Sequence, residues 1–218
     1  MKTKVTPTQR ALNLWAVVLI IWAIYRAKFR FPEWVDELIA KPLVFVFPVY
    51  YYIKKIEKKP FFSAIDLKSK ISAPDLLISF IIGGIFSFSA MTANILKFKR
   101  VIFFQRAVSI ESFLFMVMLA LATGISEEIL SRGFVLRRLY EESKNIYTSS
   151  FFASILFFFL HVPILFTNLK LTGDLLLMVL ATDMILSLVN SFVFLQRRSL
   201  VVPILIHAFY NLSIVLFL

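Results

Sequence analysis

Hydrophobic residues follow one another in long stretches along the chain, and most charged residues lie between these stretches. About 20 apolar residues are needed for a helix to cross a bilayer. Stretches of roughly this length are predicted at 11–27, 35–53, 75–96, 111–141, 146–166, 174–196 and 200–218. The pattern therefore predicts an all-α protein, a polytopic transmembrane helix bundle of about seven spans, forming one integral membrane domain over residues 1–218.

Three of these stretches differ from a simple span. The first lacks a small-residue cleavage site and runs into the basic sequence RAKFRFPEW, so we expect a retained anchor and no cleaved signal peptide. The second contains Lys41, Pro42 and Pro48, and we expect it to be kinked or only partly inserted because proline interrupts helical hydrogen bonding. The fourth is longer than a bilayer requires, so its charged end, residues 137–144, is expected to project into water.

The composition supports a membrane protein. Hydrophobic residues make up 60% of the 218 residues, and 25 residues are phenylalanine, whereas a soluble domain has about 45–50% apolar residues. The formal net charge of +11 would suggest nucleic acid as the partner of a soluble protein. Here the Lys and Arg residues lie in short loops beside the apolar stretches, so the expected partner is membrane lipid with anionic headgroups, and not nucleic acid.

The distribution of positive charge also indicates an orientation. With the loops assigned to alternate sides, 14 Lys and Arg residues lie on the side of the N-terminus and 8 on the other side. Positive residues favour the cytoplasmic side, so we expect a multi-pass protein of the cell membrane with a cytoplasmic N-terminus. The absence of cysteine excludes disulfides, thiolate metal sites and a cysteine nucleophile.

Charged and titratable residues inside the apolar stretches are the candidates for chemistry. A charged side chain in the middle of a bilayer costs about 2.5–3.5 kcal/mol on insertion scales, so it tends to mark a functional site or a buried pair. The candidates are Lys41, Glu127, Glu128, Arg132 and Asp183, together with the only two histidines of the chain, His161 and His207. Both histidines lie inside apolar stretches while the loops contain none, which favours a shared site. Asp183 is interpreted as a buried polar contact of the sixth span, and Asn190 as a neighbour of the cavity.

The fourth and fifth spans are predicted to form a helical hairpin that turns near Lys144. Glu127 and Glu128 lie 17 and 16 residues before this point, and His161 lies 17 residues after it. Since the rise per residue is the same on both helices, the two acids and the imidazole are expected at one level. Neighbouring residues differ by about 100° in direction, so one glutamate can face a cavity while the other turns to a neighbouring helix or to Arg132. Arg132 lies one turn after Glu128, and the two can form a simple helix ion pair.

The last span carries a second polar pair. His207 and Asn211 are four residues apart and can present an imidazole and a carboxamide on one helix face. Only about seven residues separate His207 from the start of its span. We therefore expect it to lie at a shallower depth than His161, unless the span is tilted or its start near Pro203 is recessed.

Three motifs on successive late spans resemble one known family. Glu-Glu-x-x-x-Arg in EEILSR, Phe-x-x-x-His in FFFLH and His-x-x-x-Asn in HAFYN occur in this order, and Gly133 follows the arginine. They resemble the CPBP family, the CAAX-protease and bacteriocin-processing membrane proteins, also called the Abi family, which includes the Rce1-type prenyl endopeptidases. The resemblance covers about residues 110–218 as a catalytic core. Ser131 departs from the pattern, because many members have an aromatic residue there.

The resemblance implies an intramembrane glutamate protease that uses no cofactor. Glu127 would act as the base towards water, with His161 helping to hold the water, and His207 and Asn211 would stabilise the oxyanion. Glu128 and Arg132 would orient the site, and Phe157 would form a wall of the cavity. The expected partner is a peptide or protein substrate, which is prenylated for Rce1-type members, and nothing in residues 1–110 selects among substrates.

The residues themselves leave other functions open. A zinc metalloprotease could use the same two histidines and two glutamates, although His-Glu-x-x-His is absent and Asn211 is a poor zinc ligand. A non-enzymatic membrane scaffold or immunity protein could retain the core for packing, and an ion or proton transporter could use Glu127, Glu128 and Asp183 as a relay. A serine mechanism is disfavoured, since Ser126 and Ser131 have no histidine at a fixed local spacing.

Overall fold

The computed structural model describes residues 5–67, 71–99, 109–165 and 173–217, and every regular element in these ranges is a helix. In the labels used here, α marks α-helices and η marks π-helical segments. The elements are α1 (Pro7–Lys28), α2 (Glu33–Val35), η1 (Asp36–Ala40), η2 (Pro42–Val46), α3 (Phe47–Tyr51), η3 (Tyr52–Glu57), α4 (Phe61–Ala64), α5 (Ala73–Phe98), α6 (Ile110–Glu128), η4 (Ile129–Leu136), α7 (Arg137–Ser143), α8 (Ile146–Leu165), α9 (Gly173–Arg197) and α10 (Val201–Phe217). The prediction of an all-α fold is confirmed.

The helices follow the predicted apolar stretches closely. Among the described residues, four helical runs are long and apolar enough to cross a membrane: Pro7–Lys28, Ala73–Ile95, Ile110–Ser143 and Ile146–Pro163. The apolar α10 is shorter, with 17 residues, and the total of seven spans stays a prediction. The predicted span ends at residues 166 and 218 lie outside the described residues. So do some of the loop Lys and Arg residues from which the orientation was predicted, within 2–4, 68–70, 100–106 and at 170.

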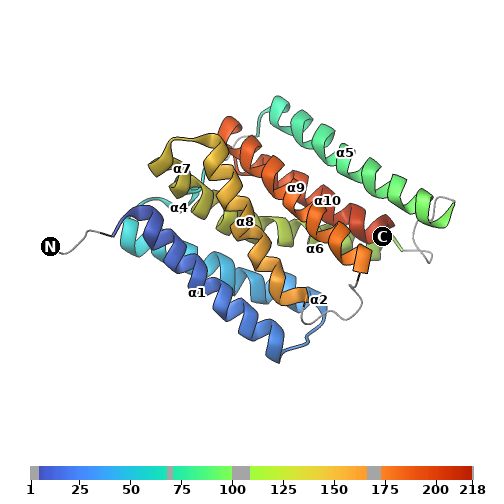
Figure 1. Cartoon of the computed structure of the whole chain (residues 1–218), viewed down its shortest axis with the longest axis horizontal. Helices are drawn as coiled ribbons and strands as arrows, with labels where there is room; N and C mark the ends of the chain where they lie inside the picture. Colours follow the sequence, from blue (N-terminus) through green and yellow to red (C-terminus); the bar gives the residue numbers. More distant parts are fainter. Residues whose placement is uncertain (1–4, 68–70, 100–108, 166–172, 218) are drawn as a thin grey trace.

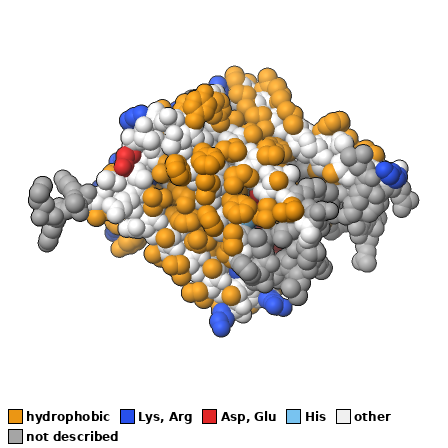
Figure 2. Space-filling model, in the orientation of Figure 1, with side chains coloured by type: hydrophobic (Ala, Val, Ile, Leu, Met, Phe, Trp, Pro, Cys, Tyr) orange, Lys and Arg blue, Asp and Glu red, His pale blue; other side chains and the backbone are white. Residues whose placement is uncertain are grey.

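The surface has the character of a lipid-facing protein. Figure 2 shows hydrophobic side chains across the middle of the visible face, with Lys and Arg side chains at its margins. Ile20, Leu43 and Phe88, which lie on three different helical segments, are each more than half exposed. Apolar exposure on this scale is costly in water and favourable in a hydrocarbon environment. The chain is therefore an integral membrane protein.

The motif-bearing helices lie in the centre of the bundle. In Figure 1, α1 and α5 lie on opposite sides, with α8, α9 and α10 between them. α5 packs mainly against α10, α10 also packs against α6 and α9, and α8 packs against α9 and α1. This arrangement surrounds the C-terminal end of α6, where the two adjacent glutamates stand, with protein.

The second helical run stays helical from Glu33 to Glu57 despite its prolines. It does so through wide turns: the Lys41 N–H bonds to the Asp36 carbonyl, and the Phe47 N–H bonds to the Pro42 carbonyl, both over five residues. Local π-type turns help membrane helices to accommodate proline, and they are frequent at functional sites. The proline-containing stretch was expected to be kinked or only partly inserted, and the structure accommodates its prolines in a continuous helix with wide turns.

The predicted hairpin between the fourth and fifth spans is present. Lys144 adopts a left-handed conformation with φ of +57°, its N–H bonds to the Tyr140 carbonyl at 2.9 Å, and α8 begins two residues later. Residues 141–144 are exposed as expected. Arg138 is not, because its guanidinium stacks on Phe134 at 4.1 Å and is held by both carboxylate oxygens of Glu57 at 3.0 and 2.7 Å.

Candidate functional site

The two adjacent glutamates at the end of α6 point in different directions, as their helical spacing predicts. Glu127 is 4% exposed and faces a cavity, whereas Glu128 is 0% exposed and faces the interior of the bundle. The helix continues beyond them into the wide turns of η4, where the Arg137 N–H bonds to the Arg132 carbonyl five residues earlier. The two carboxylates therefore have different partners, apart from His207, which lies near both.

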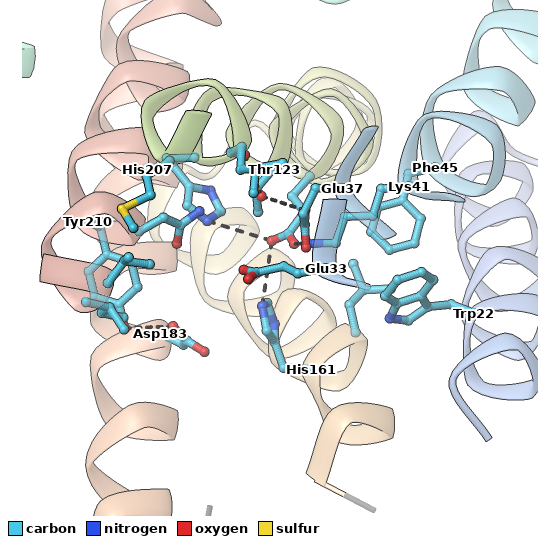
Figure 3. Close-up of a pocket in the computed structure, with 18 of the residues that line it drawn as sticks. Trp22, Glu33, Glu37, Lys41, Phe45, Thr123, His161, Asp183, His207 and Tyr210 are labelled. Carbon is cyan, nitrogen blue, oxygen red and sulfur yellow. Dashed lines mark hydrogen bonds and ion pairs between the residues drawn. The ribbon is translucent and has the colours of Figure 1, made fainter. Parts of the chain in front are cut away.

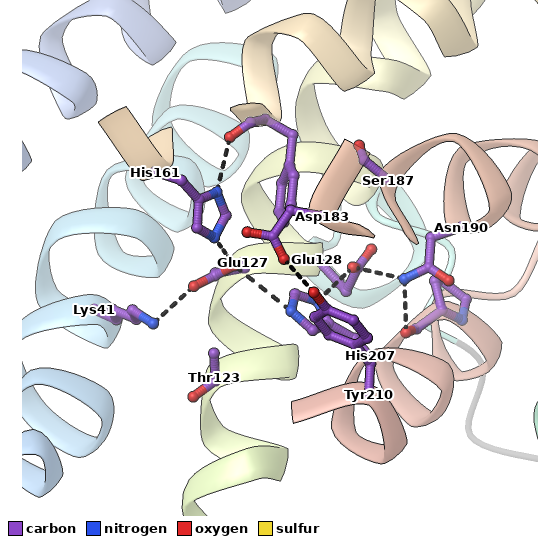
Figure 4. Close-up of polar contacts among 12 residues, drawn as sticks. Lys41, Thr123, Glu127, Glu128, His161, Asp183, Ser187, Asn190, His207 and Tyr210 are labelled. Carbon is purple, nitrogen blue, oxygen red and sulfur yellow. Dashed lines mark hydrogen bonds and ion pairs between the residues drawn. The ribbon is translucent and has the colours of Figure 1, made fainter. Parts of the chain in front are cut away.

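Glu127 uses its two oxygens differently (Figure 4). Oε1 accepts a hydrogen bond from the Lys41 ammonium group at 2.7 Å. Oε2 lies 3.6 Å from His161 Nε2 and 3.7 Å from His207 Nε2. It is buried and has no hydrogen-bond partner among the described residues. One carboxylate oxygen is thus held in place, and the other is free between two imidazoles.

His161 lies level with Glu127, which confirms the count along the predicted hairpin. Its Nδ1 lies 3.1 Å from the carbonyl oxygen of Phe157, one turn earlier on α8. A carbonyl can only accept, so Nδ1 carries the proton in this hydrogen bond, and Nε2 is the ring nitrogen that points towards Glu127. The two rings of Phe157 and His161 pack with centroids 4.7 Å apart. The imidazole is therefore oriented from its own helix.

Glu128 forms the second network. Its Oε1 accepts hydrogen bonds from Arg132 Nη1 at 2.9 Å, Asn190 Nδ2 at 3.0 Å and His207 Nδ1 at 2.8 Å. Arg132 also donates through Nη2 to the backbone oxygen and the hydroxyl of Ser187, at 3.1 and 2.7 Å. The predicted Glu128–Arg132 bridge is present, and it extends to α9 and α10. Glu128 thereby fixes the orientation of His207.

His207 reaches the same depth as His161, since both Nε2 atoms lie within 3.7 Å of one oxygen. A shallower position was expected unless the start of the span was recessed, and this exception applies because the start of α10 is buried in the protein. Leu200 and Val202 are fully buried, and the Leu200 N–H bonds to the Asp66 carbonyl at 2.9 Å. Gly124 allows this close packing, since a Cβ added there would lie 3.0 Å from the Ile204 carbonyl oxygen.

A cavity of about 440 Å³ opens beside Glu127 (Figure 3). Of the residues predicted for the site, Glu127, His161, His207 and Asn211 line it. Glu128, Arg132 and Phe157 are fully buried behind them. Phe157 packs against the rings of both histidines, with centroids 4.7 and 5.9 Å away, and its ring lies 4.4 Å from the Arg132 guanidinium carbon. It therefore supports the histidines from behind.

Some lining residues were missed by sequence reasoning. The N-terminal half contributes Trp22, Glu33, Glu37, Lys41 and Phe45. Lys41 was flagged as an intramembrane charge but was given no role. Helical spacing could have indicated Glu37 and Thr123. Glu37 is four residues before Lys41, Thr123 is four residues before Glu127, and residues with this spacing share one helix face. Both also line the cavity.

Asp183 and Asn190 of α9 both have buried polar partners. Asp183 is buried and accepts a hydrogen bond from the Tyr210 hydroxyl at 2.8 Å, as expected for a buried polar contact, and both residues also line the cavity. Asn190 bonds Glu128 and the Pro203 carbonyl, at 3.0 and 3.2 Å. It therefore lies beside the site, behind the cavity.

A buried carboxylate between two imidazoles can act in general acid–base catalysis on a bound substrate. The fold and the site are therefore those expected of a membrane-embedded enzyme. The comparison with known protein families agrees with an enzyme of this kind. The family model described as type II CAAX prenyl endopeptidase Rce1-like matches residues 109–213, from the start of α6 into α10. Over these residues the chain is similar to the Rce1-like family, which confirms the resemblance seen in the three motifs and implies a peptidase acting on a peptide or protein. No curated protein and no solved structure matches the chain.

Proposed function

We propose that this protein is an intramembrane endopeptidase in which Glu127 activates a water molecule for attack on a peptide bond. One observation carries the proposal: Glu127 Oε2 is buried, has no hydrogen-bond partner in the described part of the chain, and faces the Nε2 atoms of His161 and His207 inside a cavity. A general base must lie within reach of the proton that it removes. A water molecule bound here reaches it directly.

The hydrogen bonds of His161 suit it to hold that water. Its Nδ1 proton points to the Phe157 carbonyl, so Nε2 accepts a hydrogen bond. The water donates one proton to Nε2 and the other to Glu127 Oε2. As the water oxygen bonds to the scissile carbon, its proton passes to Glu127. The same proton then moves to the leaving nitrogen as the carbon–nitrogen bond breaks.

His207 and Asn211 are proposed to stabilise the oxyanion that forms at the scissile carbonyl. They lie one turn apart on α10 and both line the cavity. His207 donates its Nδ1 proton to Glu128 Oε1, with the two atoms 2.8 Å apart. It can therefore donate a second hydrogen bond through Nε2 only as an imidazolium. Its charge would then lie beside Glu127 and Glu128. Removal of one oxyanion donor typically lowers kcat by about 10²–10³-fold.

The proposed substrate is a prenylated CAAX-type peptide or protein, cut near its C-terminus at the membrane. The support comes from the family and from the cavity, where Phe45, Phe115 and Leu119 offer an apolar surface beside the polar residues. We also propose the cell membrane as the location, with the N-terminus in the cytoplasm, because the loop charges favour that orientation.

A zinc mechanism with the same residues is the main rival. Two imidazole nitrogens and a carboxylate oxygen are chemically suitable ligands. Among the described residues, however, no group of three or more His and acidic side chains is arranged to hold a metal ion. The Lys41 ammonium group, 2.7 Å from Glu127 Oε1, would also repel a bound cation. The rival is tested directly with a chelator.

The experiment uses the purified protein in detergent with a farnesylated CAAX peptide and its unprenylated counterpart, with products identified by mass. We expect cleavage of the farnesylated peptide that persists with chelator and is lost in Glu127→Ala. Loss of cleavage with chelator would favour zinc. Cleavage of the unprenylated peptide at an equal rate would refute prenyl specificity. A biological effect that survives Glu127→Ala at normal protein levels would favour a non-enzymatic scaffold.

A further inference from the structure

Lys41 is a buried cation that the three motifs do not include. It is 6% exposed and lies on the second helical run, outside the residues that match the family model. A charge in this position is costly unless it is paired. The Lys41 Nζ atom lies 2.7 Å from Glu127 Oε1 and 2.7 Å from Glu37 Oε2. Its charge is therefore placed between two carboxylates, one of which is the proposed base.

These contacts form part of a closed cluster between two helical runs. Glu37 and Lys41 are one turn apart on the second run, and Thr123 and Glu127 are one turn apart on α6. The Thr123 hydroxyl donates to Glu37 Oε2 at 2.5 Å, which completes the set Thr123–Glu37–Lys41–Glu127. Figure 3 shows Thr123, Glu37 and Lys41 in a row, with His207 to their left and His161 below them. The matching one-turn spacing on both helices fixes their register at the site.

We propose that Lys41 is a positioning residue for Glu127, an inference that rests on the proposed peptidase function. Lys41 holds Oε1 and thereby turns Oε2 towards His161 and His207. A carboxylate held through one oxygen cannot rotate about its last bond without losing a buried charge-assisted hydrogen bond. The N-terminal half of the chain thus contributes directly to the geometry of a site whose motifs all lie in the C-terminal half.

Substitution of Lys41 should affect turnover more than substrate binding. In Lys41→Met the apolar side chain has a similar length, Glu127 Oε1 loses its donor, and two carboxylates face each other without the cation. The misplacement of a reacting group by about 1 Å can lower the rate by about 100-fold. We therefore expect kcat to fall by about 100-fold with KM changed by less than about threefold.

Lys41→Arg and Lys54→Met serve as comparisons. Arginine keeps a positive donor towards Glu127, so we expect it to restore kcat to within about tenfold of wild type. Lys54 is exposed and lies on the same helical run, so Lys54→Met makes the same chemical change away from the cavity and should leave kcat unchanged. If Lys41→Met does not yield folded protein, Lys41→Met with Glu37→Gln removes one of the two facing charges and should show the same loss of kcat.

Steady-state kinetics on the cleaved peptide and thermal unfolding are measured for each variant. The inference is supported by a large loss of kcat in Lys41→Met, rescue in Lys41→Arg and no change in Lys54→Met. It is overturned if Lys41→Met keeps wild-type kcat, or if Lys41→Met and Lys41→Arg lose kcat equally in step with a loss of thermal stability. An inactive wild type would refute the proposed function itself, which separates the two failures.

Discussion

Replacement of Glu128 by glutamine separates the charge of this residue from its shape. Three donors, from Arg132, Asn190 and His207, reach the same oxygen of Glu128, Oε1, at 2.8–3.0 Å. The other oxygen, Oε2, is buried without a partner among the described residues. A glutamine can place its amide oxygen in the position of Oε1 and accept the same hydrogen bonds. The substitution therefore removes mainly the negative charge.

The loss of this charge leaves Arg132 as an unpaired cation that is 0% exposed. Removal of one partner from a buried ion pair typically costs about 3–5 kcal/mol. The contacts of Arg132 with the backbone and hydroxyl oxygens of Ser187 remain, which favours the lower part of this range. For a chain of this size about 1 kcal/mol lowers the melting temperature by about 2–4 °C, so the whole range corresponds to about 6–20 °C and we expect a decrease in its lower half.

The assay is thermal unfolding of purified protein in one detergent, followed by intrinsic fluorescence, for wild type, Glu128→Gln, Arg132→Met and the double variant. Because the double variant removes both charges, it should be less destabilised than the sum of the two single variants. A melting temperature of Glu128→Gln within about 2 °C of wild type would refute the reasoning. So would additive losses in the double variant, since they would show that the two charges are not coupled.

Two further predictions concern the last helix. In Gly124→Val the new side chain would meet the carbonyl oxygen of Ile204, which a Cβ alone would approach to 3.0 Å. α10 must then shift, and kcat should fall by about tenfold or more, whereas Gly84→Val, at a position with open space around a Cβ, should leave kcat unchanged. Asn211→Ala should lower kcat by about 10²-fold with KM nearly constant, and a loss confined to KM would contradict an oxyanion role.

The parts of the site that were predictable depend on the regular geometry of helices. The rise per residue is constant, so the distance of Glu127 and His161 from the turn at Lys144 set their common level. The 100° step between neighbours likewise separated Glu127 from Glu128. Each of these relations is contained within one helix or one hairpin, and the length of the apolar stretches located the helices themselves.

The parts that were missed or left open depend on contacts between distant segments. Lys41 and Glu127 are 86 residues apart in sequence, and only the packing of the second helical run against α6 brings them together. The depth of His207 follows from the hydrogen bond between Leu200 and Asp66, which draws the start of α10 into the protein. No local pattern in either segment specifies its partner, so the sequence alone left these features open.

The most direct test of the account is the turnover number of Glu127→Gln, compared with wild type in parallel with its thermal unfolding. Glutamine keeps the size of Glu127 and can still accept a hydrogen bond from Lys41, but it cannot take a proton from water. A general base typically contributes about 10²–10⁴-fold to the rate. The account predicts a loss of kcat in this range in a protein that remains folded. A folded Glu127→Gln variant that keeps more than about one tenth of wild-type kcat would contradict Glu127 as the base.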